Sequence, residues 1–380
     1  MSRARSSSFL LPAVAGAAAT FCGIGLSRFA YVPLFPATVA AGWITGPEGG
    51  FVGALNFAGY LAGVAGGRAL SRTLGLHRAL DGGMACAGLS FLACAFDGGV
   101  VWLAVWRFVA GGAGGVLMGL VGPAVQGAVE PGRRGLAGGT VVAGVGVGIV
   151  TGSLAVPLLL RFGLPAAWAG LGGGILVLWL LVRRHWPAPA PAGDADAARR
   201  PGAGMLYLLY ALLGAGIVPH MIYFADLAVR ARGFDLGTGA RLWLLFGVGG
   251  IAGTLLCGRA ADTWGARQAL RFGAAIQVAA LISSLATAPA LLAVSGFLGG
   301  ISALGLSAAA LARCRELAGP AAGAVWIRAT AAYAAAQAAS GFVLAELFRA
   351  LGSHDALFAA GLGLSVVGLA AAAVLPPDRS

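Results

Sequence analysis

Two long apolar runs in the second half of the chain are joined by Gly258-Arg259-Ala260-Ala261-Asp262-Thr263-Trp264-Gly265-Ala266-Arg267-Gln268-Ala269-Leu270, the most polar short turn of that half. The matching place in the first half reads Gly67-Arg68-Ala69-Leu70-Ser71-Arg72-Thr73-Leu74-Gly75-Leu76-His77-Arg78-Ala79-Leu80. The two Gly-Arg-Ala triplets are separated by about half the chain, and aligning them puts Ser71 where Asp262 stands. Repetition at half the chain length predicts two related halves.

The composition identifies the environment of the chain. Of its 380 residues 59% are hydrophobic and only 10% are charged, whereas a soluble domain carries about 25% charged residues. A chain this apolar cannot cover a water-facing surface, so we expect a multi-pass membrane protein in contact with the lipid bilayer. The net charge of +12 comes from arginines in short loops between apolar runs. That placement indicates membrane topology and argues against a nucleic-acid partner.

Apolar segments of spanning length predict twelve transmembrane helices, because lipid offers no partner for unpaired backbone groups. They cover residues 10–38, 50–70, 80–96, 99–127, 136–160, 165–184, 204–228, 240–260, 270–287, 290–312, 322–347 and 355–375. The Pro/Ala-rich, charged stretch between the sixth and seventh segments is too polar to cross a bilayer and is typical of a linker. We therefore predict a six-helix bundle over residues 1–185, a cytoplasmic linker over 186–203, and a second six-helix bundle over 204–380.

Arginine distribution predicts the orientation. With the N-terminus inside, 17 of the 25 basic residues, all of them arginine, fall on the cytoplasmic side and five fall outside. Both termini are therefore expected in the cytoplasm, in the cell (inner) membrane. Trp43, Trp102, Trp168 and Trp243 are expected at the outer interface. The five cysteines show no metal-ligand spacing, so neither a metal site nor a cofactor is expected. We expect a monomer.

Several motifs resemble those of a known transporter class. The pattern G-x-x-A-D-x-x-G-x-R-x-x-L over residues 258–270 resembles the loop signature of the major facilitator superfamily, and Arg107-Phe108-Val109-Ala110-Gly111 resembles the arginine motif on its fourth helix. The run G-x-G-x-x-R-F-A-Y-x-P-L-x-P over 23–36 and the run over 218–226 resemble the YbfB/YjiJ family of that superfamily. The resemblance implies a major facilitator fold, working by alternating access with a substrate site between the halves near the midplane.

Ionisable residues inside a membrane are costly and are candidates for function. The substrate and coupling candidates are Arg28, Tyr31, Asn56, Arg107, His220, Tyr223, Asp226 and Gln337. We expect three buried arginines, Arg28, Arg107 and Arg328, against one deeply placed aspartate. This excess of positive charge favours an anionic or carboxylate-bearing substrate. His220 is either a packed histidine or a protonatable cavity residue, with protons then a second partner.

Several ionisable side chains also have a purely structural interpretation. Arg107 could mainly brace its own half, Arg328 could snorkel to the interface, and Glu346 could be an interface residue. His77, His185 and His354 are predicted in loops, exposed to solvent.

The resemblance also suggests gating residues, namely Ser71, Arg134, Asp262 and Arg267. Asp262 is expected to approach the start of the fifth helix near residue 136, where the helix dipole favours a carboxylate and Arg133 or Arg134 offers a partner. From their similar depths we predict that Arg28 and Asp226 pair across the halves when the protein faces inward. In the alternative reading, Arg28 binds carbonyls freed by Pro33 and Pro36, and Asp226 lies in outer-face water beside Arg230.

These observations predict a secondary active transporter for a small molecule, with proton coupling and an anionic substrate as the finer expectations. The first-half loop has serine in place of the acidic residue, and the fifth helix has Gly152-Ser153 instead of the Gly-Pro pair typical of proton-driven drug antiporters. These departures argue against drug–proton antiport. One alternative is a transporter-like sensor or scaffold that moves nothing. Another is an intramembrane enzyme, which the lack of a converging catalytic set argues against.

Overall fold

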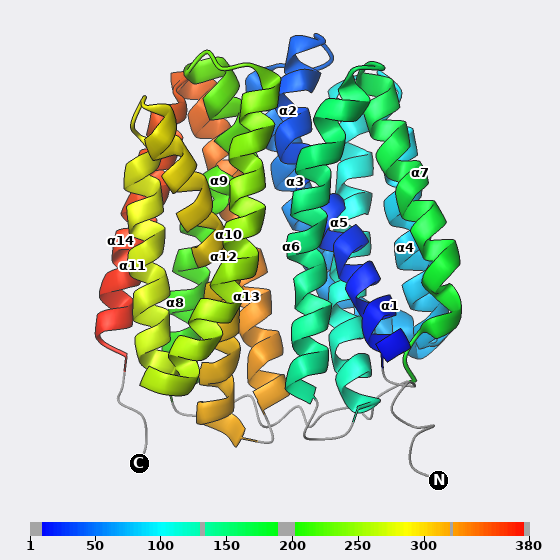
Figure 1. The fold of residues 1–380 in the computed structure, drawn as a ribbon, viewed down its shortest axis with the longest axis vertical. Helices are drawn as coiled ribbons and strands as arrows, with labels where there is room; N and C mark the ends of the chain where they lie inside the picture. The colour runs from blue at the N-terminus through cyan, green and yellow to red at the C-terminus, as the bar shows by residue number, and fades with distance from the viewer. Residues whose placement is uncertain (1–9, 130–133, 189–201, 320–321, 376–380) are drawn as a thin grey trace. The chain divides into compact units, whose positions relative to one another are not determined.

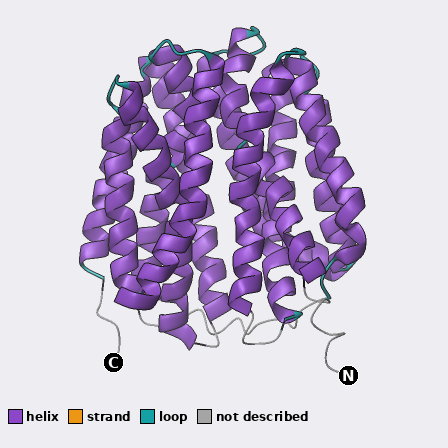
Figure 2. Cartoon of the chain, viewed as in Figure 1, coloured by secondary structure: helices purple, strands orange, loops and turns teal. Residues whose placement is uncertain are grey.

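The computed structural model describes residues 10–129, 134–188, 202–319 and 322–375, and within these ranges it contains helices and no strand (Figure 2). The helices form twelve membrane-length stretches in the predicted order, which confirms the all-α fold. Ten stretches are long and apolar enough to span a membrane by themselves. The other two, α4 (Leu76–Ala93) and α11 (Ala266–Ser284), are the third of each half, and each carries two charged residues. The predicted linker lies mostly outside the described residues.

Internal contacts divide the chain into two compact units, each a bundle of long helices (Figure 1). Unit 1 comprises Met1–Thr45 and Leu55–Ala192, and unit 2 comprises Gly46–Ala54 and Gly193–Ser380. The helices of the first half are α1 (Leu10–Thr20), α2 (Tyr31–Ala40), α3 (Gly46–Leu74), α4, α5 (Gly99–Gly127), α6 (Arg134–Leu160) and α7 (Leu164–Val182). The start of α3 thus groups with unit 2, and the division into bundles over residues 1–185 and 204–380 stays a prediction.

The second half repeats this order. It contains α8 (Ala203–Gly216), α9 (Val218–Asp226), α10 (Leu236–Trp264), α11, α12 (Pro289–Ala318), α13 (Ala322–Leu351) and α14 (His354–Ala373). Packing repeats as well, because α1 packs on α6 and α4 on both α5 and α7, while α8 packs on α13 and α11 on both α12 and α14. The two halves are therefore built on one scaffold.

The repeated polar turn has the same backbone in both halves. Gly75 has φ 86° and ψ 154°, and Gly265 has φ 85° and ψ 153°. Only glycine adopts such a conformation readily, which explains a glycine at both positions. When Gly75 is aligned with Gly265, the first residues of α3, α4, α5 and α7 coincide with those of α10, α11, α12 and α14. The expected alignment is therefore wrong by one position, and Arg72 rather than Ser71 matches Asp262.

The first membrane stretch, predicted as one helix over 10–38, is interrupted between α1 and α2. A π-helical segment covers Phe21–Leu26, in which the Ser27 N–H donates to the Cys22 carbonyl at 2.9 Å, and a turn follows over residues 27–30. Pro33 has no N–H for the Phe29 carbonyl, which instead accepts from the Val32 N–H at 3.3 Å. The interruption places Arg28 in the turn rather than on a regular helical face.

The seventh stretch, predicted as one helix over 204–228, is also interrupted. It divides into α8, α9 and a π-helical segment, Leu227–Ala231. Pro219 at the start of α9 cannot donate to the Ala215 carbonyl, and the Ser340 hydroxyl of α13 donates to that oxygen at 2.9 Å. A side chain of a neighbouring helix thus supplies a hydrogen bond that proline removes.

Two helices of unit 2 begin at side-chain caps. Asp235 accepts hydrogen bonds from the hydroxyl and the backbone N–H of Thr238, and these bonds lower the pKa of Asp235. Ser353 accepts from the Ala356 N–H at 3.3 Å. The second cap fixes the start of α14 at His354.

Glycines allow the second and fourth helices of each half to approach closely. A Cβ added at Gly59 of α3 would clash with the Phe108 carbonyl oxygen of α5, and one added at Gly249 of α10 would clash with the Phe297 carbonyl oxygen of α12. Gly59 and Gly249 occupy matching positions in the alignment of the two halves. In lipid, where packing replaces the hydrophobic drive, such backbone contacts hold helices together.

Candidate functional site

Arg107 of α5 is the most deeply buried cation among the described residues of unit 1. Its residue is 1% exposed, and none of its three guanidinium nitrogens has a hydrogen-bond partner among the described residues. Three aromatic rings surround the group instead. The guanidinium carbon lies 4.9 Å from the ring centre of Tyr31, 5.6 Å from that of Phe91 and 5.9 Å from that of Trp168. Cation–π contacts stabilise the charge but leave its N–H groups unused.

Arg28 lies in the same unit with a different set of rings. Its guanidinium carbon is 4.2 Å from the ring centre of Phe57 and 4.6 Å from that of Tyr60. Asn56 connects the two arginine-bearing segments, because its amide nitrogen donates to the Arg107 carbonyl at 2.9 Å and to the Ser27 carbonyl at 3.3 Å. Asn56 was predicted to face substrate, but its nitrogen holds the interrupted first stretch against α5.

Unit 2 holds a buried carboxylate with two basic partners. Asp226, at the end of α9, is fully buried. Its Oδ2 lies 2.7 Å from Nε2 of His354 and 3.2 Å from Nη1 of Arg230. His354 comes from the first turn of α14 and is 6% exposed, while the Arg230 side chain is 33% exposed. The ring centre of Phe348 lies 4.6 Å from that of His354, in an edge-to-face contact.

The remaining candidates of unit 2 are buried around α9. Nε2 of His220 lies 2.9 Å from the Ser295 hydroxyl, and its ring packs against Phe224, Phe246 and Phe358. Gln337 donates to the Met221 sulfur at 3.1 Å. Tyr223 is fully buried and packs edge to face on Phe348 at 5.6 Å. The packing of His220 is that of a side chain held in a core, with a serine hydroxyl as its polar partner.

Comparison with known proteins now identifies the class. The family described as "Uncharacterised MFS-type transporter YbfB" matches residues 20–374. The chain belongs to this family. A search of curated proteins finds no match. Among solved structures, a partially occluded inward-open conformation of the xylose transporter XylE from E. coli matches with a TM-score of 0.79 and 14% identity, over 98% of this chain and 99% of that one.

The XylE similarity establishes the fold alone at this level of identity. Together, family and fold make the chain a multi-pass membrane protein of the major facilitator superfamily and not an enzyme. The predicted resemblance to the YbfB/YjiJ family and the predicted fold are confirmed.

The structure of this YbfB-family protein corrects several predictions. His354 was expected in a solvated loop and is instead buried, in contact with Asp226. Asp226 does lie beside Arg230, but it is shielded from water. Arg328 is exposed, so the buried arginines behind the charge argument are two and not three. Trp168, expected at the outer interface, and likewise Trp243 are fully buried.

Glu346 is exposed near the end of α13. Its side chain is 65% exposed and pairs with Arg349, one helical turn later, with 2.9 Å between Oε2 and Nε. An exposed pair of this kind contributes little to stability.

The gating candidates lie around the turns of the repeated loop. Asp262 is exposed in the last turn of α10, and Ser71 is half-buried near the end of α3. Arg267, the second residue of α11, donates to the Leu375 carbonyl at 3.5 Å, and Arg271, one turn later, donates to the Ala372 carbonyl at 2.9 Å. These two arginines therefore cap the C-terminal end of α14. Arg134 begins α6, but its side chain and Arg133 lie outside the described residues, as does the predicted contact with Asp262.

Four residues of the site were not among the candidates predicted from the sequence, namely His354, Arg230, Phe91 and Trp168. Arg230 carried a signal, because a residue four positions after a helical aspartate lies beside it. His354 carried none, because it is 128 residues from Asp226.

Proposed function

We propose that this YbfB-family protein is a secondary active transporter that moves a small anionic molecule by alternating access and couples this movement to protons. The observation that carries the proposal is the buried Arg107 guanidinium, whose N–H groups have no hydrogen-bond partner among the described residues.

The energetics of Arg107 favour an anionic ligand. A buried charge is costly unless it is paired and hydrogen-bonded. Cation–π contacts contribute roughly 0.5–2 kcal/mol each, and this does not replace the hydrogen bonds that a guanidinium loses on leaving water. A carboxylate or phosphate accepts two parallel N–H bonds from arginine and supplies the missing charge. The rings of Tyr31, Phe91 and Trp168 favour a ligand with an apolar body beside its anionic group.

The Asp226 cluster supports proton coupling. With a neutral histidine, Asp226 and Arg230 cancel in charge, and a proton added to the Asp226–His354 pair leaves the cluster with a net charge of +1. Histidine is the side chain whose protonation changes near neutral pH. Because the pair lies where α9 meets the first turn of α14, its protonation would change the contact between two helices of one unit.

The anionic substrate is tested by binding and uptake. The melting temperature of the purified protein is measured in the presence of each of five compounds. They are a monocarboxylate, a dicarboxylate, a phosphate monoester, a neutral sugar and a quaternary ammonium ion. We expect only the anions to raise the melting temperature. We also expect proteoliposomes that contain the protein to take up the stabilising anion.

Two substitutions sharpen this test. Arg107→Gln should abolish the shift and Arg107→Lys should weaken it, because lysine cannot form the bidentate pair. Arg328→Gln removes an exposed arginine and serves as the matched control. Stabilisation by a neutral or cationic compound that survives Arg107→Gln would disprove the anion proposal.

Proton coupling is tested with a pH-sensitive dye inside the proteoliposomes. Addition of the transported anion should move protons with the wild-type protein. His354→Gln and Asp226→Asn should stop the proton movement while preserving exchange of labelled for unlabelled substrate. Proton movement that persists in both variants would show that residues other than Asp226 and His354 couple transport to protons.

The orientation and organisation are also part of the proposal. We propose that both termini and the linker between the two bundles face the cytoplasm and that the protein works as a monomer in the cell membrane. Reporter fusions at residue 195 and at the C-terminus should both report cytoplasm, and an external reading at either would reject this topology.

A further inference from the structure

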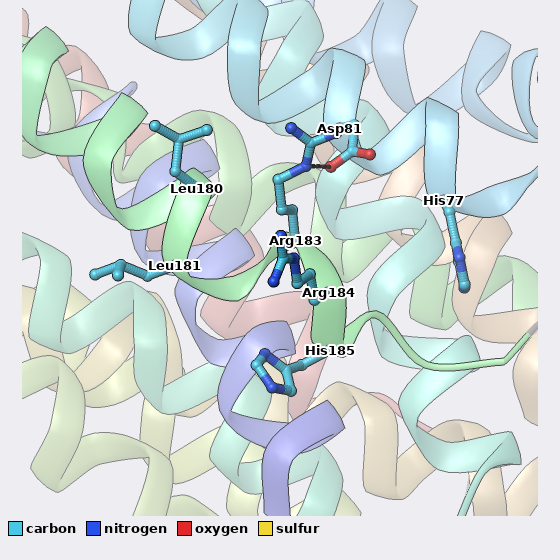
Figure 3. Close-up of a pocket in the computed structure, with 7 residues that line it drawn as sticks. All are labelled: His77, Asp81, Leu180, Leu181, Arg183, Arg184 and His185. Carbon is cyan, nitrogen blue, oxygen red and sulfur yellow. Dashed lines mark ion pairs between the residues drawn. The ribbon is translucent and has the colours of Figure 1, made fainter.

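Unit 1 contains a cavity of about 680 Å³ where α4 begins and α7 ends (Figure 3). His77 and Asp81 line it from α4, and Arg183, Arg184 and His185 line it from the short 3-10 turn that follows α7. The cavity lies apart from Arg107 and its rings, which it does not include. Its lining is rich in groups that bind anions, so its charge balance decides what it could hold.

The one acidic side chain of the lining is already engaged. Oδ1 of Asp81 accepts hydrogen bonds from the indole nitrogens of Trp179 at 2.7 Å and Trp186 at 2.9 Å. Arg183 approaches the same oxygen only at 4.0 Å, with its guanidinium over the Trp179 ring. Arg184 is exposed and has no ion pair among the described residues. The lining is therefore positive by one charge even with both histidines neutral.

An apolar surface adjoins this basic cavity. Leu180 and Leu181 also line it and precede the two arginines by one helical turn (Figure 3). Their side chains are 57% and 67% exposed. Exposed leucines on a membrane-spanning helix face acyl chains, and tryptophans such as Trp179 and Trp186 are common at the headgroup level. The cavity thus combines a basic pocket with a lipid-facing wall.

We propose that this cavity binds the headgroup of an anionic phospholipid, with the phosphate on Arg183 and Arg184 and the acyl chains along Leu180 and Leu181. Basic pockets between membrane helices on the cytoplasmic side recognise anionic headgroups in this way. Two features favour a lipid over a free phosphate. The exposed leucines put acyl chains directly beside the basic groups, and the arginine distribution predicts that this end of α7 lies in the cytoplasmic leaflet.

The test measures lipid binding and requires no transport. The full-length protein is exchanged into uncharged detergent and titrated with short-chain phosphatidylglycerol or phosphatidylcholine. Bound lipid is counted by native mass spectrometry, and melting temperature is followed in parallel. We expect phosphatidylglycerol to bind and stabilise, and phosphatidylcholine to do neither. Arg183→Gln and Arg184→Gln should each weaken phosphatidylglycerol binding about fivefold, the effect of one basic residue near an anionic surface.

A control separates the pocket from general surface charge. Arg78→Gln removes an exposed arginine of α4 that is next to His77 in sequence but not among the lining residues, and it should leave binding within about twofold. Equal binding of both lipids, or equal loss in Arg78→Gln, would overturn the site. Displacement of phosphatidylglycerol by millimolar glycerol phosphate would overturn the lipid as its ligand. Arg184→Gln keeps the Arg183–Asp81 contact, so its effect does not depend on that contact.

Discussion

The hydroxyl of Ser340 offers a sharp test of how the seventh membrane stretch is held in its interrupted form. It donates to the Ala215 carbonyl at 2.9 Å, the oxygen that Pro219 cannot serve. Ser340 is 8% exposed, so Ser340→Ala leaves this carbonyl oxygen without its donor in an apolar setting. Hydrogen bonds between membrane helices contribute about 0.6 kcal/mol on average and up to about 1.7. We expect Ser340→Ala to lower the free energy of unfolding by about 1 kcal/mol.

Pro219→Ala supplies the missing donor from within the chain. An alanine N–H at this position can bond the Ala215 carbonyl four residues earlier, so the same Ser340→Ala change should then cost almost nothing. The double-mutant cycle should give a coupling of about 1 kcal/mol. Unfolding by sodium dodecyl sulfate in mixed micelles, followed by tryptophan fluorescence, measures all four proteins.

Ser302 provides the matched control for this cycle. It is also a buried serine of unit 2, but its hydroxyl donates at 2.9 Å to the Gly299 carbonyl of its own helix, one turn earlier. Ser302→Ala and Pro219→Ala should therefore be additive. A coupling energy between Ser340→Ala and Pro219→Ala below about 0.3 kcal/mol is within the usual limit of additivity. Such a value would refute the idea that the Ser340 hydroxyl replaces the backbone N–H that Pro219 lacks.

Other contacts give three further predictions. Asp226→Ala should destabilise the protein by about 3 kcal/mol because it leaves His354 and the partly exposed Arg230 without their anion. His354→Gln keeps a hydrogen-bond donor and should cost less than half of that in the same unfolding assay. Gly249→Ala should lower the melting temperature because its Cβ meets backbone on α12, and Gly258→Ala, which meets nothing within 4 Å, should not. The cross-half pair of Arg28 with Asp226 stays a prediction, and in uptake assays a charge-swapped double variant should be more active than either single reversal.

Hydropathy and turn chemistry predicted the scaffold well because both act locally. Twelve apolar runs became twelve helical stretches, and the glycine of the repeated turn has a positive φ in both halves. The interruptions were less accessible, although Pro33 and Pro219 were visible in the sequence. A proline shows that one hydrogen bond is missing, but it does not show whether a π-helical segment, a turn or a serine on another helix replaces it.

The site was harder to predict because its contacts are distant in sequence. Trp168 was expected at an interface, since an aromatic residue near a helix end has the same local signature whether it faces lipid or a buried arginine. His354 follows a helix cap, a position that usually lies in water, and only the packing of α14 against α9 reveals that it meets Asp226. Burial of ionisable groups was predicted correctly for Arg28, Arg107 and Asp226, where spanning-length apolar sequence surrounds them on both sides.

The repeat itself separates what both halves share from what each half adds. With Gly75 aligned to Gly265, Arg107 of α5 matches Phe297 of α12, and His354 of α14 matches Leu164 of α7. Neither ionisable side chain has a counterpart, although the helices that carry them correspond. Aromatic support is partly retained, because Trp168 beside Arg107 matches Phe358 beside His220.

A shared scaffold with unshared charges is what a division of roles between the halves would produce. Under the proposed function, the first half would hold the anion on Arg107 and the second would hold the proton on Asp226 and His354. Symmetric chemistry would need a cation near Phe297 or an acid–base pair near Leu164, and the sequence has neither. Arg107→Gln should therefore impair anion binding without affecting the pH response, and His354→Gln should do the reverse. A variant of either residue that loses both together would show that one half carries both tasks.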